Sequence, residues 1–321
     1  MIVITGAAGF IGSCMVGRLN REGFNDLVLV DDFSKVEKKK NWTDKKYSEI
    51  VDREHFFEWA SDKGNRIQFI FHLGARTNTT EFDQEVLKAL NFDYSKDMWS
   101  YCIKEGIPLV YASSAATYGM GELGFSEDSD KDLGLKPLNP YGQSKLDFDR
   151  WAETQTDSPY FWAGLKFFNV YGPNEYHKGR MASVIMHAYN QIKQTGELKL
   201  FRSHRTDYAD GEQKRDFVYV MDVLDVMMFF LHNRKNNGIY NLGSGTANTF
   251  NHLATCIFET LNKPEQVNYV DTPIDIRDKY QYYTCADMNK ICLLGYNKAF
   301  TTLREGVEDY INQYLVSDLI Y

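Results

Sequence analysis

The sequence predicts an α/β protein in which a doubly wound parallel sheet is joined to a smaller α/β lobe. Short β-branched or aromatic runs alternate with helix-like stretches from the first residue onward, which is typical of a parallel sheet with crossover helices. This rhythm loosens after about residue 172, and a chain of 321 residues is long enough to bury a second core. Ligands are therefore expected at the carboxyl ends of the strands.

The expected strands of the sheet are short apolar runs at 2–4, 27–30, 67–71, 109–111 and 164–168. Between them, apolar residues recur at spacings of three and four over 11–22 and 83–104, which predicts helices packed on the sheet. The later elements are expected in chain order as a helix over 181–195, a polar loop over 202–215, a strand at 217–220, a helix over 222–232 and a strand at 239–243.

The composition excludes several classes of protein. A formal net charge of −8 and a pI near 5.5 disfavour binding to nucleic acid or to an anionic membrane. The longest apolar runs fall far short of the roughly 20 residues that span a bilayer, and no export signal precedes the first strand, so we expect a cytoplasmic protein. Five scattered cysteines without a C-x-x-C pair indicate neither a disulfide framework nor a zinc site, and no metal is expected.

Three glycines, Gly6, Gly9 and Gly12, follow the first expected strand with the spacing G-x-x-G-x-x-G and open a helix. Glycines let the backbone turn tightly beside a pyrophosphate, whose charge is met by N–H groups at the helix N-terminus. Glycine-rich turns also close loops that bind nothing, but Asp31 lies 19 residues after Gly12, at the end of the second expected strand, and favours a dinucleotide site. We therefore expect a Rossmann-type domain over 1–170, to which 216–245 returns, and a smaller substrate-binding domain over 171–215 and 246–321.

The residues around Asp31 leave the choice between NAD and NADP open. An acid at this place bonds the adenosine ribose and repels a 2′-phosphate, which favours NAD. Four lysines follow it, and each either pairs with a 2′-phosphate or belongs to a solvated loop. They are Lys35, Lys38, Lys39 and Lys40.

A phenol and an ammonium, Tyr141 and Lys145, are four residues apart and are expected on one face of a helix. Because a fixed cation stabilises a phenolate, we expect Lys145 to lower the pKa of Tyr141 and make it a proton acceptor. A Y-x-x-x-K pair alone often arises by chance. Ser114, at the end of an upstream strand, would orient a substrate alcohol, although serines at strand ends are more often structural.

Four motifs together resemble the extended short-chain dehydrogenases that act on nucleotide sugars. They are T-G-x-x-G-x-x-G (5–12), S-S-A-A-T-Y-G (113–119), Y-x-x-x-K (141–145) and F-N-V-Y-G-P (168–173). The likeness runs over nearly the whole chain. Within that family, residues 177–183 and 214–220 resemble the branch that epimerises an ADP-linked heptose.

The resemblance implies an isomerase that inverts C6 of ADP-D-glycero-β-D-manno-heptose through a 6-keto sugar, with bound NADP, for the heptose of the lipopolysaccharide core. By this resemblance Tyr141 matches one base and Lys178 the other, and Ser114 holds the hydroxyl. Lys145 matches the residue that tunes the phenol and binds the nicotinamide ribose. Without the resemblance, Lys178 would be interpreted as a surface lysine. A homo-oligomer, a pentamer in this branch, is implied as well.

By the same likeness, further residues match binding positions of the family. Those for the cofactor are Phe10, Ile11, Asp31, Asp32, Lys38, Asn91, Lys145 and Lys178. Those for the substrate are Asn169, Arg180, His187, Phe201, Arg215 and Tyr280. Arg215 has independent support, because a guanidinium can bind a diphosphate through two hydrogen bonds. For Tyr280 simple packing is the alternative, and for His187 a satisfied helix histidine.

Three features depart from the family pattern and bear on these expectations. Asp32 is an acid where an amide is expected, Arg76-Thr77-Asn78 replaces a run of small residues, and the loop 202–213 is longer. Ala115 and Ala116 stand where a 4,6-dehydratase of this fold carries an acid–base pair, which disfavours dehydration. The same motifs are also compatible with a nucleotide-sugar 4-epimerase and with a non-catalytic dinucleotide-binding protein.

Overall fold

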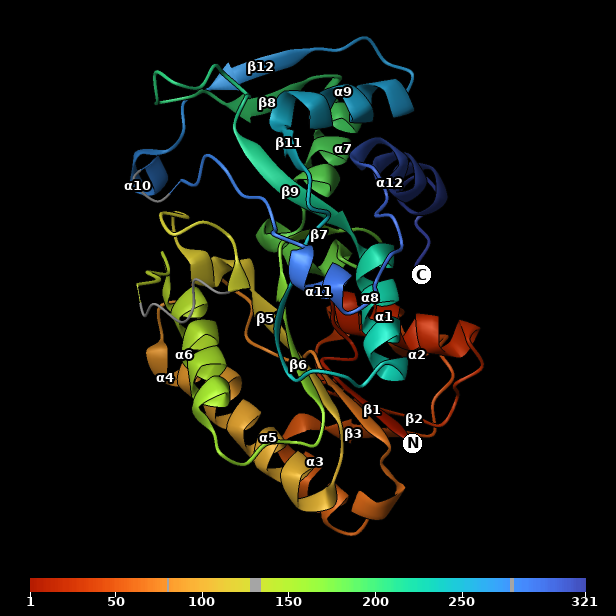
Figure 1. Cartoon of the computed structure of the whole chain (residues 1–321). Coiled ribbons are helices and arrows are strands. Elements are labelled where there is room, and N and C mark those ends of the chain that lie inside the picture. The colour runs from red at the N-terminus through yellow and green to blue at the C-terminus, as the bar shows by residue number, and fades with distance from the viewer. Residues whose placement is uncertain (80, 128–133, 278–279) are drawn as a thin grey trace.

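The computed structural model of the protein describes residues 1–79, 81–127, 134–277 and 280–321. Its centre is a seven-stranded sheet in the order β10-β6-β5-β4-β1-β2-β3, and all neighbouring strands run parallel (Figure 1). The strands are β1 (Ile2–Thr5), β2 (Leu27–Asp31), β3 (Glu49–Asp52), β4 (Phe69–His72), β5 (Leu109–Ser114), β6 (Trp162–Phe167) and β10 (Gly238–Leu242).

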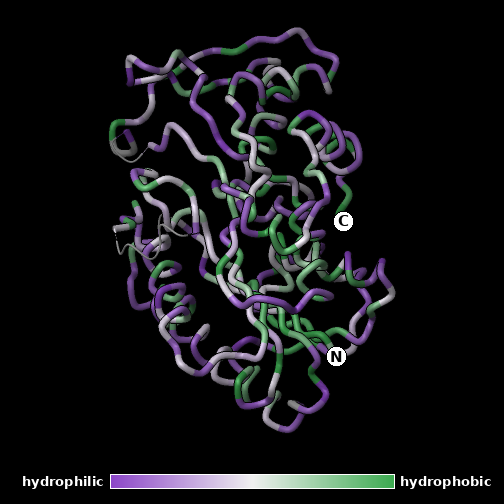
Figure 2. Tube along the Cα trace, viewed as in Figure 1, coloured by the Kyte–Doolittle hydropathy of each residue, from purple (hydrophilic) through white to green (hydrophobic). Residues whose placement is uncertain are grey.

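Helices cover both faces of this sheet, because successive residues of a buried strand point to opposite sides. On β1, Ile4 belongs to the core beneath α1 and α8, whereas Val3 belongs to the core beneath α3, α5 and α6. These helices are α1 (Phe10–Arg21), α3 (Phe56–Ser61), α5 (Tyr94–Glu105), α6 (Pro140–Thr154) and α8 (Val220–His232). Figure 2 shows hydrophobic stretches gathered on the strands between the two helix layers. The predicted doubly wound parallel sheet is confirmed.

A second, smaller lobe lies above the carboxyl ends of the strands in the view of Figure 1. It holds a three-stranded sheet, in which β9 (Lys214–Tyr219) lies between β7 (Asn169–Tyr171) and β11 (Ala247–Thr249), and a pair of parallel strands, β8 (Leu198–Phe201) and β12 (Val267–Val270). Its main helices are α7 (Val184–Thr195), α9 (Phe250–Thr260) and α12 (Leu303–Asp309). Of the segment 216–245, β10 pairs with β6 in the main sheet, whereas β9 belongs to the smaller one.

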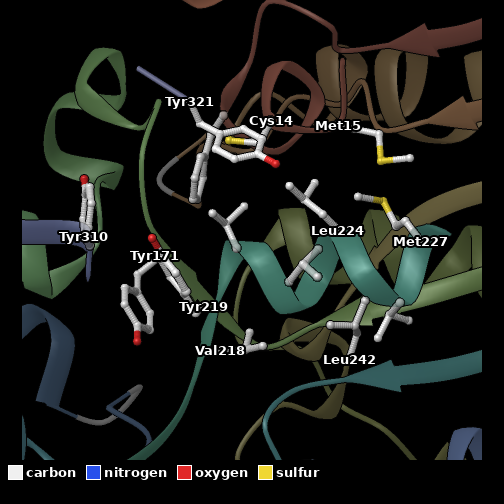
Figure 3. Packing of buried hydrophobic residues seen from close by; sticks show 14 of the residues in the cluster. Cys14, Met15, Tyr171, Val218, Tyr219, Leu224, Met227, Leu242, Tyr310 and Tyr321 are labelled. Atoms are coloured by element: carbon white, nitrogen blue, oxygen red, sulfur yellow. The ribbon is translucent and has the colours of Figure 1, made fainter. Parts of the chain in front are cut away.

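One hydrophobic core joins the two lobes. Buried side chains of α1 and α8, such as Cys14 and Leu224, share a cluster with Tyr171 of β7 and Tyr310 near the C-terminus. Figure 3 shows Cys14 and Tyr171 beside the first turns of α8, which carry Leu224, and Tyr310 on a separate helix at the left of the view. Elements of the main sheet and of the smaller lobe are therefore packed against one shared hydrophobic core.

Some elements differ from the sequence predictions. The helix expected over 83–104 is divided into α4 (Gln84–Leu87), a π-helical turn (Lys88–Asp93) and α5. The wider turn contains Asn91, whose side chain is buried and hydrogen-bonded to the loop after β4, and π-turns of this kind often mark functional sites. Strand β3, at the sheet edge, was not predicted because its two apolar residues give too short a pattern. The remaining short helices are α2 (Lys40–Thr43), α10 (Ile274–Arg277) and α11 (Asn289–Leu293).

Within the described ranges, the structure contains no helix with both the length and the apolar composition required to cross a membrane.

Candidate active site

A cavity of about 350 Å³ opens at the carboxyl ends of the strands, where the two lobes meet. Seven of the predicted site residues line it, and they come from both lobes: Phe10, Ile11, Ser114, Tyr141, Lys145, Asn169 and Lys178. Thr77 and Thr79, in the loop after β4, also line it. The cavity therefore brings together the expected hydroxyl, phenol and ammonium groups with the turn that begins α1.

The glycine loop leaves no room for larger side chains. Gly6 has a φ of +69°, and a Cβ at this residue would lie 2.7 Å from the amide nitrogen of Gly74. A Cβ on Gly12 would lie 2.1 Å from the carbonyl oxygen of Gly6. The N-cap of α1 is Gly9, which has no side-chain cap, so the N–H groups of the first turn are available to an anion.

Asp31, at the end of β2, is tied to this loop. Its buried carboxylate accepts hydrogen bonds from the backbone N–H of Ala8 at 2.9 Å and from the Lys38 ammonium at 3.0 Å. Asp32 instead accepts from the Ser34 hydroxyl, a bond that lowers the pKa of this carboxyl. An anion-ready helix N-terminus with a ribose-binding acid beside it fits a dinucleotide.

Tyr141 and Lys145 lie in the first turns of α6, whose N-cap Asn139 accepts a hydrogen bond from the N–H of Gly142. Burial raises the pKa of Tyr141, and a hydrogen bond with Ser114 partly offsets the rise. The Lys145 ammonium donates to the carbonyl oxygen of Ala112 at 2.8 Å, and burial lowers its pKa to about 8. The prediction that the pKa of Tyr141 is lowered was therefore wrong: burial and, to a smaller extent, the charge of Asp149 raise this pKa, and the effect that opposes the rise comes from Ser114.

Lys178 reaches the same cavity from the loop between β7 and α7. Its ammonium lies 5.5 Å from the centre of the Phe10 ring, and its pKa is lowered by burial against an opposing effect of Glu175. The neighbouring His177 accepts a hydrogen bond from Asn41, and burial lowers its pKa to about 4, so its imidazole is neutral near pH 7. Two groups capable of proton transfer, Tyr141 and Lys178, thus face one cavity.

With this geometry in view, the comparison with known proteins decides the family. Residues 2–243 match the model of the NAD dependent epimerase/dehydratase family. The chain belongs to this family. Its relatives include proteins named ADP-L-glycero-D-manno-heptose-6-epimerase from Fusobacterium nucleatum, 46% identical over the full length of both chains, and from Nitratidesulfovibrio vulgaris, 46% identical over 99% of this chain and 98% of the relative. The resemblance inferred from the sequence is confirmed.

Solved structures of the family agree. The Helicobacter pylori ADP-L-glycero-D-manno-heptose-6-epimerase is 27% identical, with a TM-score of 0.81 over 97% of this chain and 95% of that one. A protein solved in complex with UDP-glucuronic acid and NAD is 26% identical, with a TM-score of 0.79 over 99% of both chains. This chain, as a member of the family, thus takes a nicotinamide dinucleotide, and its glycine loop and Asp31 fit this cofactor.

Three of the predicted substrate residues, Phe201, Arg215 and Tyr280, form a separate cluster in the smaller lobe of the protein. The ring of Tyr280 lies 6.1 Å from that of Phe201 and 5.4 Å from the guanidinium carbon of Arg215. Arg215 is buried and donates hydrogen bonds to the carbonyl oxygens of Lys214 and Gln281. Arg180 and His187 are exposed and do not line the cavity described above.

Asn91 lies outside the cavity lining and holds the loop after β4 against α6. Its Oδ1 accepts from the N–H of Arg76 at 2.7 Å, and its Nδ2 donates to the Ser144 hydroxyl at 3.0 Å. His72 extends this connection: its Nδ1 contacts the Thr5 hydroxyl at 2.8 Å, and its Nε2 contacts the Ser95 hydroxyl at 3.0 Å. The glycine loop and the start of α6 are thus linked through buried polar groups.

A buried ion pair behind the cavity was not anticipated from the sequence. Asp149 accepts hydrogen bonds from the Tyr111 and Ser113 hydroxyls, and the Lys166 ammonium lies 3.1 Å from it. Because Asp149 is four residues beyond Lys145, it lies on the same face of α6. The four-residue spacing of Tyr141, Lys145 and Asp149 was the signal in the sequence that could have pointed to Asp149. Its partner Lys166, on β6, could not be found from spacing, because it lies on a different element.

Proposed function

We propose that the protein inverts C6 of ADP-D-glycero-β-D-manno-heptose, giving the L-glycero epimer with no net oxidation. The observation that carries this proposal is the pair Tyr141 and Lys178, two proton-transfer groups that line one cavity in a chain whose full-length relatives bear the name of this epimerase. The cofactor, when bound, supplies reversible hydride transfer to and from the sugar carbon. Inversion presents the sugar hydroxyl in two orientations, and two bases serve them better than one.

The residues of the cavity receive roles from their chemistry. Ser114, already hydrogen-bonded to Tyr141, orients the sugar hydroxyl, and Tyr141 takes or returns its proton in one orientation. Lys178 does the same in the other orientation, and its lowered pKa brings the free amine closer to neutral pH. Lys145 holds the nicotinamide ribose and orients the phenol. Asn169, which also lines the cavity, binds the sugar hydroxyls.

The rest of the nucleotide sugar is assigned to the smaller lobe. Arg215 binds the diphosphate, because its buried guanidinium, which donates to the carbonyl oxygens of Lys214 and Gln281, can bind a diphosphate through two hydrogen bonds. The rings of Phe201 and Tyr280 beside it hold the adenosine, while Arg180 and His187 close over the substrate from α7 and the loop before it. Gly6, Gly9, Gly12, Phe10, Ile11, Asp31, Asp32, Lys38 and Asn91 complete the cofactor site, and NADP is the proposed form.

The test is to incubate purified protein with ADP-D-glycero-β-D-manno-heptose without added reductant and to follow the C6 epimers by proton NMR. The expected result is the L-glycero epimer with no net consumption of cofactor. Conversion of UDP- or GDP-sugars instead, with the heptose unchanged, would favour a 4-epimerase. Tightly bound cofactor without any product would favour a non-catalytic binding protein.

The same proposal includes a cytoplasmic place in the synthesis of lipopolysaccharide core heptose and a homo-oligomeric state, a pentamer in the branch that the sequence resembles. Size-exclusion chromatography with light scattering measures that state directly.

A further inference from the structure

Glu175 is a buried acid at the start of the loop that carries Lys178. Its carboxylate accepts hydrogen bonds from the Ser183 N–H at 2.5 Å, from the Ser183 hydroxyl at 2.6 Å and from the Gly172 N–H at 3.4 Å. Tyr310, from the C-terminal π-helix (Tyr310–Leu315), donates a further bond. Neither the sequence motifs nor the comparisons give this residue a role.

These contacts indicate that Glu175 is ionised. Each carboxylate oxygen receives a backbone N–H, Oε2 that of Ser183 and Oε1 that of Gly172, and such N–H groups, which can only donate, favour the charged form of a carboxyl. Burial raises the pKa of Glu175, and the bonds from Ser183 oppose the rise.

The carboxylate also closes the loop on itself. It joins Gly172, at the end of β7, to Ser183, at the start of α7, so both ends of the segment 175–183 are held at one point. Within the segment, the N–H of Lys178 donates to the carbonyl oxygen of Glu175 at 2.9 Å. Gly179, which follows Lys178, has a φ of +52°, a conformation that glycine adopts readily, so the chain can turn back towards Ser183 here.

We propose that Glu175 is a positioning residue for Lys178: its carboxylate fixes the loop in place and its negative charge balances the Lys178 ammonium at the edge of the cavity. The role of Lys178 as a base is part of the proposed function, and this inference rests on it. The arrangement explains why an acid is buried among backbone donors at the start of the segment that carries a lysine which must change its protonation state.

Among the groups around Glu175 and Lys178, Glu175 supplies the negative charge that acts on the Lys178 ammonium. Burial lowers the pKa of Lys178, and the field of Glu175 raises it. His177, on the same loop, is neutral, because burial lowers its pKa to about 4. From the other elements packed on Glu175, Cys14 of α1 and Tyr310 are both uncharged, since burial raises the pKa of each, that of Cys14 to about 12.

The experiment compares Glu175→Gln with the wild-type enzyme by competitive acetylation. Trace acetic anhydride is applied over a series of pH values, and mass spectrometry of the Lys178 peptide gives the pH at which the amine becomes reactive. Without the carboxylate, this midpoint is expected to fall by about 1 pH unit, the size of effect that a nearby opposite charge exerts. An unchanged midpoint in a folded Glu175→Gln protein overturns the inference.

Two control variants separate charge from structure. Asp222→Asn removes another buried carboxylate, which lies on α8 outside the loop and the cavity and accepts from Thr301, and it should leave the Lys178 midpoint unchanged. Tyr310→Phe removes one donor but keeps the charge, so it should also leave the midpoint unchanged. A downward shift in either control equal to that in Glu175→Gln would indicate a general loss of packing and overturn the inference.

Turnover provides the second readout. In Glu175→Gln the limb of the kcat profile that follows Lys178 should move to lower pH by the same amount. If wild-type protein does not epimerise the heptose while the labelling midpoint still shifts, the proposed function fails and the coupling between the two residues stands. If Glu175→Gln does not fold, Glu175→Asp keeps the charge on a shorter side chain. It should retain the midpoint and lose kcat, and full kcat in that variant would overturn the positioning role.

Discussion

Lys38 donates a hydrogen bond of 3.0 Å to Asp31, so the acid expected to repel a 2′-phosphate already carries a cation beside it. The second oxygen of Asp31 is bonded to the Ala8 N–H of the glycine loop. Ordinarily an acid at this place favours NAD. Here the Lys38 ammonium can remain with the carboxylate when NAD binds or turn to a 2′-phosphate when NADP binds, and the pair therefore bears directly on cofactor choice.

Replacement of Lys38 by methionine should weaken NADP more than NAD. A charge-assisted hydrogen bond to the 2′-phosphate contributes about 1.5–3 kcal/mol, so NADP affinity should fall by about tenfold or more. Isothermal titration calorimetry with both cofactors measures the two changes. Lys35→Met is the matched control, because Lys35 is exposed and 3.9 Å from Asp32, and it should change neither affinity. Equal losses for NAD and NADP in Lys38→Met would mean that Lys38 only holds Asp31.

Substitution of Gly12 by alanine should strongly weaken dinucleotide binding. The new Cβ would meet the carbonyl oxygen of Gly6 at 2.1 Å, and the turn beside the first N–H groups of α1 must then open. Such overpacking costs about 1–3 kcal/mol. Calorimetry and thermal unfolding should both register the loss. In Gly17→Ala, on the same helix, the nearest atom is the end of the flexible Lys45 side chain, and binding should persist. Normal affinity in Gly12→Ala would contradict a close approach of the pyrophosphate to this turn.

The part of the site that could be predicted from the sequence is set by local spacing. Gly6 and Gly12 follow a strand and open a helix, while Tyr141 and Lys145 are one helical turn apart, so few residues fix each relationship. Ser114 could be predicted as a site residue because it lies at the end of a short apolar run that indicates a strand. The sheet was predictable for the same reason, because each buried strand is a short apolar run of its own.

The parts that could not be predicted depend on partners far away in the chain. Glu175 gains its environment from Tyr310, more than 130 residues later, and nothing in the sequence around either residue indicates the contact. The pKa of Tyr141 was predicted in the wrong direction because burial, which raises this pKa, is a property of the packed cavity. Strand β9 belongs to the smaller sheet, where it pairs with β7 and β11, and the local sequence pattern does not encode this pairing.

Acid should destabilise the protein through His72. Burial lowers the pKa of His72 to about 3 from an ordinary 6.5, so the unfolded chain takes up a proton that the folded protein refuses. The contribution of the neutral imidazole is intact above pH 6.5 and is lost as the pH falls from 6.5 towards 3, by about 2 kcal/mol at pH 5.

Urea unfolding of wild type and His72→Gln at pH 7.5 and 5 isolates this share. The difference between the two proteins should narrow by about 2 kcal/mol at the lower pH, because the glutamine variant carries no group to titrate. His252→Gln, at an exposed position of α9, should keep a constant difference from wild type. A difference that is independent of pH in His72→Gln would show that the imidazole is not held neutral.

Removal of one base at a time should separate the two halves of the epimerisation. In Tyr141→Phe the hydroxyl proton of one epimer has no acceptor, whereas Lys178 still serves the other, and Lys178→Met should show the reverse. Overall turnover should fall by about 10²–10⁴-fold in each variant, the usual worth of a positioned acid–base group. Single-turnover absorbance of the reduced nicotinamide, measured with each epimer in turn, should reveal one surviving half-reaction per variant.

The controls are Tyr160→Phe and Lys235→Met, at exposed positions outside the cavity, which should retain full turnover. If Lys178→Met kept full turnover while Tyr141→Phe lost both half-reactions, a single base would suffice, as in a 4-epimerase, and the assignment of Lys178 would have to be withdrawn.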